Sequence, residues 1–92
     1  MRHIALLGST GSIGRQALEV IALHPERLGV ELLTAQNSWQ LLVEQALQFQ
    51  PNAVVIGNTA HLDNVRQALA NTDIKVYGVK DHVGRMQGQV LL

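Results

Sequence analysis

Three glycines, at positions 8, 11 and 14, follow a short apolar run and constrain the fold more than any other feature of the sequence. The run, residues 4–7, has the composition of a strand buried on both faces, and a segment of helical period begins at Ser12. Gly8 allows a sharp turn, Gly11 leaves room for a phosphate near the backbone, and Gly14 allows the helix to pack closely on the sheet. The pattern predicts a phosphate-binding turn, because free N–H groups and the dipole at the start of a helix favour an anion.

The spacing of these glycines leaves an alternative open. G-x-x-G-x-x-G is one residue longer than the commonest dinucleotide-binding motif, G-x-G-x-x-G. The same residues could therefore form a glycine-rich turn that binds no ligand. We favour the binding turn, because strand, loop and helix occur in the order that phosphate binding requires.

The rest of the chain continues the alternation of strands and helices. Apolar runs predict further strands at residues 28–34, 53–56 and 74–77, and helical periodicity predicts helices at 12–23, at 39–50, from 58 or 59 onward, and at 81–92. Pro25 and Pro51 are expected to end the first two helices. The β-α-β-α-β-α-β-α order predicts an α/β fold, a Rossmann-like parallel sheet flanked by helices with right-handed crossovers.

The apolar residues also predict how these elements pack. The side chains expected to face the sheet from the first helix are those of Ile13, Ala17, Val20 and Ile21. Trp39 lies on the apolar stripe of the second helix, where packing is its expected role rather than contact with an adenine ring. We expect strand 74–77 at the outer edge beside the third strand, which leaves the first strand unpaired on one side. Such an open edge recruits other chains, so self-association is predicted.

Composition limits the size and the class of the protein. The chain has 92 residues, 47% of them hydrophobic, which is enough for one small domain and no second one. Seven basic and seven acidic residues cancel, and no basic run indicates a nucleic-acid surface. The sequence has no cysteine, and no apolar stretch has the length of a signal-peptide core or a membrane span. We therefore expect a cytoplasmic protein that binds neither nucleic acid nor membrane.

The sequence contains no recognisable set of catalytic residues. The four histidines are scattered without metal-ligand spacing, so no metal site is predicted within these residues. Ser9 and Ser12 lie among glycines but do not form a nucleophile elbow, and hydrogen bonding to phosphate is their expected role. Residues 90–92 form an apolar run without a capping glycine, which predicts that the chain is a fragment of a longer polypeptide. Any catalytic residues are then expected beyond position 92.

Several segments together carry a family resemblance: residues 7–14 (LGSTGSIG), 18–21 (LEVI), 24–26 (HPE), 33–37 (LTAQN) and 42–46 (LVEQA). They resemble the N-terminus of 1-deoxy-D-xylulose 5-phosphate reductoisomerases, over about the first sixty residues well and over the remainder loosely. The resemblance implies that residues 1–92 are the N-terminal NADPH-binding Rossmann domain of a longer enzyme.

The resemblance also implies an activity and a set of cofactor contacts. Enzymes of this family convert 1-deoxy-D-xylulose 5-phosphate to 2-C-methyl-D-erythritol 4-phosphate in non-mevalonate isoprenoid biosynthesis, with NADPH and a divalent metal (Mg or Mn), usually as homodimers. The residues that match the positions contacting the NADPH phosphates are Thr10, Gly11, Ser12 and Ile13. The loop that holds the adenosine end corresponds to Gln36, Asn37 and Ser38, where family members often carry Gly-Lys-Asn and this chain has no lysine.

Two functions from different classes remain open on the sequence. One is the cofactor-binding part of a reductoisomerase, inactive on its own because metal and substrate residues lie elsewhere. The other is a module that binds a dinucleotide without chemistry. In both, the absence of a carboxylate from residues 34–38 predicts a preference for NADPH over NADH, since NAD-selective sites place an acid there.

Overall fold

One parallel sheet organises the chain in the computed structural model, which describes residues 1–78 and 89–91. Within these residues the elements are β1 (Arg2–Leu6), α1 (Ser12–Leu23), β2 (Leu28–Ala35), α2 (Trp39–Phe49), β3 (Ala53–Ile56), the 3-10 turn η1 (Thr59–His61), α3 (Leu62–Ala68), β4 (Lys75–Gly78) and β5 (Gln89–Leu91). The described strands form a five-stranded sheet in the order β4-β3-β2-β1-β5. The predicted α/β fold with a parallel sheet is confirmed, including β4 at the edge beside β3.

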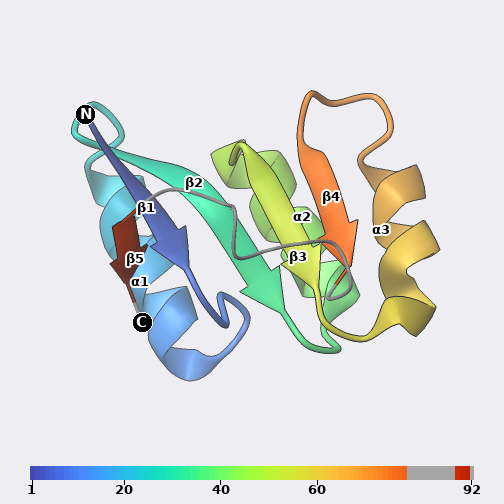
Figure 1. The fold of residues 1–92 in the computed structure, drawn as a ribbon. Coiled ribbons are helices and arrows are strands. Elements are labelled where there is room, and N and C mark those ends of the chain that lie inside the picture. The colour runs from blue at the N-terminus through green and yellow to red at the C-terminus, as the bar shows by residue number, and fades with distance from the viewer. Residues whose placement is uncertain (79–88, 92) are drawn as a thin grey trace.

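The helices form a layer against the sheet. In Figure 1, α1 and α2 lie behind the strands, and α3 lies next to β4. Helices on one face are expected when successive right-handed crossovers all move in the same direction along a sheet. All the strands consequently end with their carboxyl termini at one edge, where the loop after β1 and the loop after β2 are neighbours.

The core lies between the sheet and the helix layer. Leu6 of β1, Leu33 of β2 and Leu42 of α2 are among its fully buried side chains. Residues on the opposite face of the strands form a second, smaller buried cluster of Ala5, Leu32, Ala53 and Val55. Burial on both faces explains why these strands are continuous apolar runs rather than alternating ones.

The end of the chain differs from the prediction. Residues 81–92 were expected to be helical, but Gln89–Leu91 form β5, which pairs in parallel with Ile4–Leu6 of β1. The remainder of the predicted helix, 81–88 and 92, lies outside the described residues. Periodicity alone cannot distinguish a short apolar run in a strand from one in a helix, and the backbone groups of β1 offered such a run partners. Because β1 is paired on both sides, the predicted open edge is wrong, and self-association is left without that edge as its cause.

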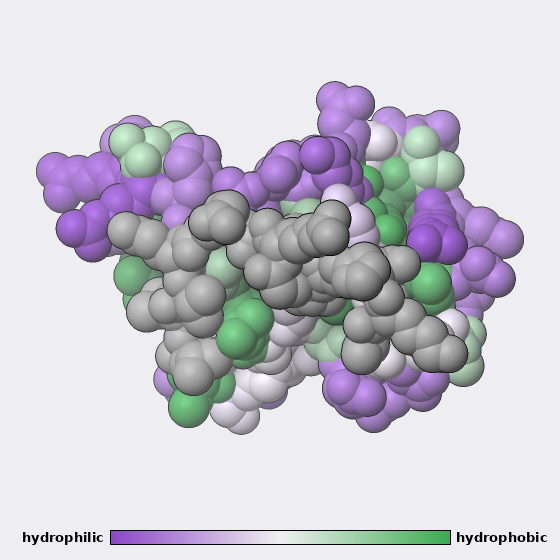
Figure 2. Space-filling model, in the orientation of Figure 1, coloured by the Kyte–Doolittle hydropathy of each residue, from purple (hydrophilic) through white to green (hydrophobic). Residues whose placement is uncertain are grey.

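The prediction for the inner face of α1 is right for Ile21, which is buried, and for Ala17, which packs against the core, and it is wrong for the other two residues. Gly14, Leu18 and Ile21 are buried, at offsets of four and seven, whereas Ile13 and Val20 are 68% and 53% exposed. Apolar residues occur on two sides of this helix, and the side that carries Gly14 is the one that can approach the sheet closely. Figure 2 accordingly shows hydrophobic surface at the lower left, in the region where α1 begins.

We predict that two leucines of α2 differ sharply in their contribution to stability. Leu42 is 0% exposed and Leu47 is 48% exposed. Leu42→Ala should lower the free energy of unfolding by about 2–5 kcal/mol, because it removes buried methyl groups and leaves a cavity. Leu47→Ala, the matched control in the same helix, should change it by no more than about 0.5 kcal/mol. Urea titrations of the two variants measure both values, and equal losses would contradict this packing of α2.

Candidate functional site

The loop between β1 and α1 begins with a tight turn at Gly8. Gly8 has a φ of 75°, in the left-handed region that favours glycine. Its carbonyl oxygen accepts from the Gly11 amide at 3.1 Å, and its own amide donates to the Thr34 hydroxyl at 2.8 Å. The turn is therefore fixed both locally and by the end of β2.

Gly14 allows α1 to lie against this loop. A Cβ atom at this position would lie 2.7 Å from the Ser9 Cα atom and 2.9 Å from the Ser9 carbonyl carbon, and would overlap the Gly8 carbonyl oxygen. These are backbone atoms, so no side-chain rotation relieves the overlap. The predicted role of Gly14 in close packing is confirmed.

Gly11 differs from the other two glycines of the motif. A Cβ atom there would meet the Gly8 carbonyl oxygen at 3.5 Å, an ordinary contact, and Gly11 is exposed with an extended backbone (φ −78°, ψ 174°). The fold itself thus accepts a side chain at position 11. Nothing within the described residues therefore requires glycine at this position.

Ser9 supports the loop from the inside. It is 0% exposed, its hydroxyl donates to the Gln45 Oε1 atom at 2.8 Å, and the Gln45 Nε2 atom donates to the Ser9 carbonyl oxygen at 3.0 Å. The Ser9 amide also donates to the Thr34 carbonyl oxygen at 2.8 Å. The expectation that Ser9 binds phosphate is wrong, because its polar atoms serve contacts within the protein.

Gln45 is a supporting residue that was not predicted from the sequence. Gln45 could have been noticed in the sequence as a polar residue on the apolar face of α2, where Val43 and Ala46 are also buried. A buried amide requires hydrogen-bond partners, and the loop after β1 supplies them.

The start of α1 brings four of the predicted site residues together. Thr10 is half-buried, while Gly11, Ser12 and Ile13 are exposed around the first turn. The N-cap residue is Gly11, and no side chain caps the helix there. The first N–H groups of a helix have no acceptor within the helix, so this end of α1 can offer them to an anion.

The remaining predicted residues, Gln36, Asn37 and Ser38, lie in the loop after β2. All three are exposed, and the adjacent Thr34 bonds to Gly8, so this loop and the glycine loop share one edge of the sheet. Asn37 is tied to the next loop, because its Oδ1 atom accepts from the Asn58 Nδ2 atom at 2.9 Å.

In the described loops after β1, β2 and β3, one side chain is able to carry a charge. The segments 7–14, 34–40 and 57–62 contain no Asp, Glu, Lys or Arg, and one histidine, His61. Apart from His61, the groups that these segments offer to a ligand are neutral side chains, backbone N–H groups and helix N-termini. Nothing in these segments repels an anion.

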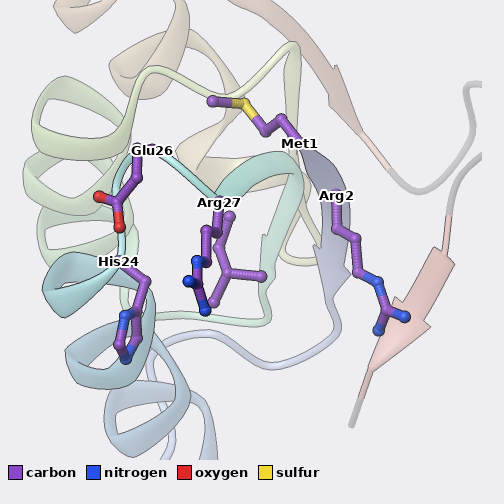
Figure 3. Close-up of a pocket in the computed structure, with 6 residues that line it drawn as sticks. Met1, Arg2, His24, Glu26 and Arg27 are labelled. Carbon is purple, nitrogen blue, oxygen red and sulfur yellow. The ribbon is translucent and has the colours of Figure 1, made fainter.

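A hollow near the opposite edge of the sheet is a less suitable site. A pocket of about 510 Å³ is lined by Met1, Arg2, His24, Glu26, Arg27 and Leu28, at the amino ends of β1 and β2. Figure 3 shows that the Arg2 and Arg27 side chains extend in different directions, so they do not converge on one ligand. Ligands of open parallel sheets bind at the carboxyl ends of the strands, which is the edge that carries the glycine loop.

The described residues hold neither a cluster of metal ligands nor a membrane-spanning helix. Residues 1–78 and 89–91 contain no group of three or more His, Cys, Asp or Glu side chains placed to hold a metal ion. No helix within the same residues has the length and apolar composition to cross a membrane.

We predict that Gly14 and Gly11 differ in their effect on stability. Gly14→Ala forces a methyl group into the Ser9 backbone and should lower the free energy of unfolding by about 1–3 kcal/mol, despite the better helix propensity of alanine. Gly11→Ala, the matched control, should stay within about 0.5 kcal/mol of the parent. Thermal unfolding followed by circular dichroism compares them, and a fully tolerated Gly14→Ala would contradict the close approach of α1.

Comparisons with known proteins agree on one family. The family model described as 1-deoxy-D-xylulose 5-phosphate reductoisomerase matches residues 4–88. The reductoisomerase of Phocaeicola vulgatus is 48% identical over 85 residues, which is 92% of this chain and 22% of the relative, and that of Bacteroides fragilis is 51% identical over 76 residues, 83% of this chain and 20% of the relative. The chain thus spans about a fifth of the length of these curated relatives.

Solved structures give the same result. The reductoisomerase of Zymomonas mobilis in complex with NADPH matches with a TM-score of 0.81 and 28% identity, over 84% of this chain and 20% of that one. A DOX-P reductoisomerase in complex with NADPH, fosmidomycin and magnesium also has a TM-score of 0.81, at 26% identity, over 88% of this chain and 20% of that one. With its glycine loop, its parallel sheet and these matches, the chain belongs to the 1-deoxy-D-xylulose 5-phosphate reductoisomerase family.

Proposed function

We propose that residues 1–92 are the NADPH-binding domain of a 1-deoxy-D-xylulose 5-phosphate reductoisomerase. Gly11 is the observation that carries the proposal, because the fold accepts a side chain at this position and a bound phosphate does not. The likeness to reductoisomerases that hold NADPH supports the same edge of the sheet as the cofactor site.

The start of α1 is the proposed site for the cofactor phosphates. Gly11 allows them to approach the backbone, and the N–H groups of the first turn together with the Thr10 and Ser12 hydroxyls donate hydrogen bonds. The exposed Ile13 side chain is available to cover apolar parts of the cofactor. Ser9, Gln45 and Thr34 hold the loop in this shape before a ligand arrives, which lowers the entropy cost of binding.

The loop of Gln36, Asn37 and Ser38 is the proposed site for the adenosine end. An acidic residue after β2 accepts hydrogen bonds from the ribose hydroxyls of NAD and repels a 2′-phosphate. This loop has neutral amide and hydroxyl groups instead, and α2 begins directly after it. The arrangement accepts the additional phosphate of NADPH.

Activity of the whole enzyme is assigned to a longer polypeptide. NADPH would supply a hydride when bound, while the sugar-phosphate substrate and the divalent ion, Mg or Mn, would be held by residues outside positions 1–92. We further propose a cytoplasmic homodimer for that enzyme. The part played by the present residues is to bind the cofactor and to orient it.

We predict that Gly11→Val weakens NADPH binding at least tenfold, or about 1.4 kcal/mol. The valine side chain occupies the space through which a phosphate approaches the backbone, whereas a Cβ atom at this position makes only an ordinary contact with the loop. Calorimetric titration of the parent and the variant with NADPH measures the change, and circular dichroism verifies that both are folded. If a folded Gly11→Val bound NADPH as tightly as the parent, the loop would be a turn without a ligand.

We also predict that the parent binds NADPH roughly tenfold more tightly than NADH, and that Gln36→Asp reverses this order. The carboxylate would repel the 2′-phosphate and accept hydrogen bonds from the ribose. Gln36→Asn, a matched control without charge, should keep the original order. Titration of both cofactors against the three proteins decides the matter, and unchanged NADPH binding by Gln36→Asp would mean that this loop does not contact the 2′ position.

A further inference from the structure

The proposed adenosine site lacks the cation that a phosphate dianion usually meets. Charged donors bind phosphate more strongly than neutral ones, and the loop of Gln36, Asn37 and Ser38 has neither Lys nor Arg. In the loops that follow β2 and β3, residues 34–40 and 57–62, His61 is the one side chain able to carry a positive charge. The position of this histidine therefore bears directly on cofactor choice.

His61 is held next to the loop after β2. The strands β2 and β3 are paired up to Ala35 and Ile56, and the pairing continues beyond them, since the Asn58 amide donates to the Gln36 carbonyl oxygen at 2.8 Å. The side chains of Asn58 and Asn37 are also bonded, at 2.9 Å. The His61 amide in turn donates to the Asn58 carbonyl oxygen at 3.0 Å. His61 thus follows a rigid connection between the two loops.

The His61 ring is stacked on Trp39, the first residue of α2. The ring centroids are 6.2 Å apart, with an angle of 30° between the planes. Trp39 packs against the hydrophobic core, and its amide donates to the Asn37 carbonyl oxygen at 2.7 Å. Both rings are half-buried, so each keeps some accessible surface. The stacking on Trp39 therefore holds the imidazole beside the loop after β2.

We propose that His61 determines cofactor specificity by contacting the 2′-phosphate of NADPH as an imidazolium, and that Trp39 positions it. A protonated imidazole has two N–H donors, and a phosphate dianion beside it favours protonation. NADH lacks this phosphate and gains nothing from the contact. The proposal rests on the proposed function, because it requires that the cofactor occupies this edge of the sheet.

The test measures the ratio of NADPH to NADH affinity at pH 7 by calorimetry for the parent, His61→Gln and His61→Lys. His61→Gln should lower NADPH affinity about tenfold and leave NADH affinity unchanged, since it removes the charge and keeps a polar side chain. His61→Lys should retain the preference, because it restores a positive charge. Trp39→Leu should reduce the ratio by releasing the imidazole, while Trp39→Phe, which keeps an aromatic ring, should preserve it.

The outcomes separate this proposal from the proposed function. A parent that binds neither cofactor overturns both. A parent that binds NADPH, together with a folded His61→Gln that leaves the ratio unchanged or weakens both cofactors equally, overturns the role of His61 alone. If His61→Gln does not fold, the lysine variant decides, because loss of the NADPH preference despite a permanent positive charge contradicts a contact with the phosphate.

Discussion

The close approach of α1 to the backbone of Gly8 and Ser9 is the contact on which the carboxyl edge of this molecule depends. It requires Gly14, because any Cβ atom there would overlap main-chain atoms of the loop. The contact places the first turn of α1 directly beside the end of β1. The same contact selects Gly14, Leu18 and Ile21 as the inner face of the helix and leaves Ile13 in solvent, next to the exposed Gly11. The contact that packs α1 against the loop therefore also exposes the N-terminus of the helix at the edge of the sheet.

A buried polar pair secures this arrangement from the opposite side. Ser9 and Gln45 exchange two hydrogen bonds in the interior, and the backbone and hydroxyl of Thr34 bond the loop to β2. Burying an amide is costly unless its donors and acceptors are satisfied, and here no buried side-chain polar atom of the described residues lacks a partner. Because the pair has strict geometric requirements, it specifies the loop more narrowly than an apolar contact would. The loop between β1 and α1 is consequently ordered by contacts with β2 and α2 as well as by the strand that it follows.

Features that depend on neighbouring residues in the sequence could be predicted, and features that depend on contacts between residues far apart in the sequence could not. The turn at Gly8, the helix ends before Pro25 and Pro51, and the strands of continuous apolar composition follow from short stretches of chain. The burial of Ser9 depends on Gln45, which is 36 positions away, and no local pattern indicates it. Ile13 and Val20 were wrongly predicted to lie on the inner face of α1, because two sides of the helix are apolar. The strand β5 was wrongly predicted to be helical, because a short apolar run suits either a strand or a helix. The seven predicted site residues do lie at one edge of the sheet, whereas the nearby Asn58 and His61 come from the next loop and were found only in the structure.

The three glycines of the motif differ in why glycine suits each position: two are required by the fold, and the third leaves space that a ligand can use. Gly8 is demanded by a left-handed backbone and Gly14 by the neighbouring main chain, so both would be needed in a protein that bound nothing. Gly11 meets neither demand, since its backbone is extended and its surroundings are open. The sequence alone cannot distinguish a glycine that the fold requires from one that it does not, because all three positions are glycine. Geometry does separate them, and the glycine that the fold leaves unexplained lies at the uncapped start of a helix, beside two loops without acidic residues.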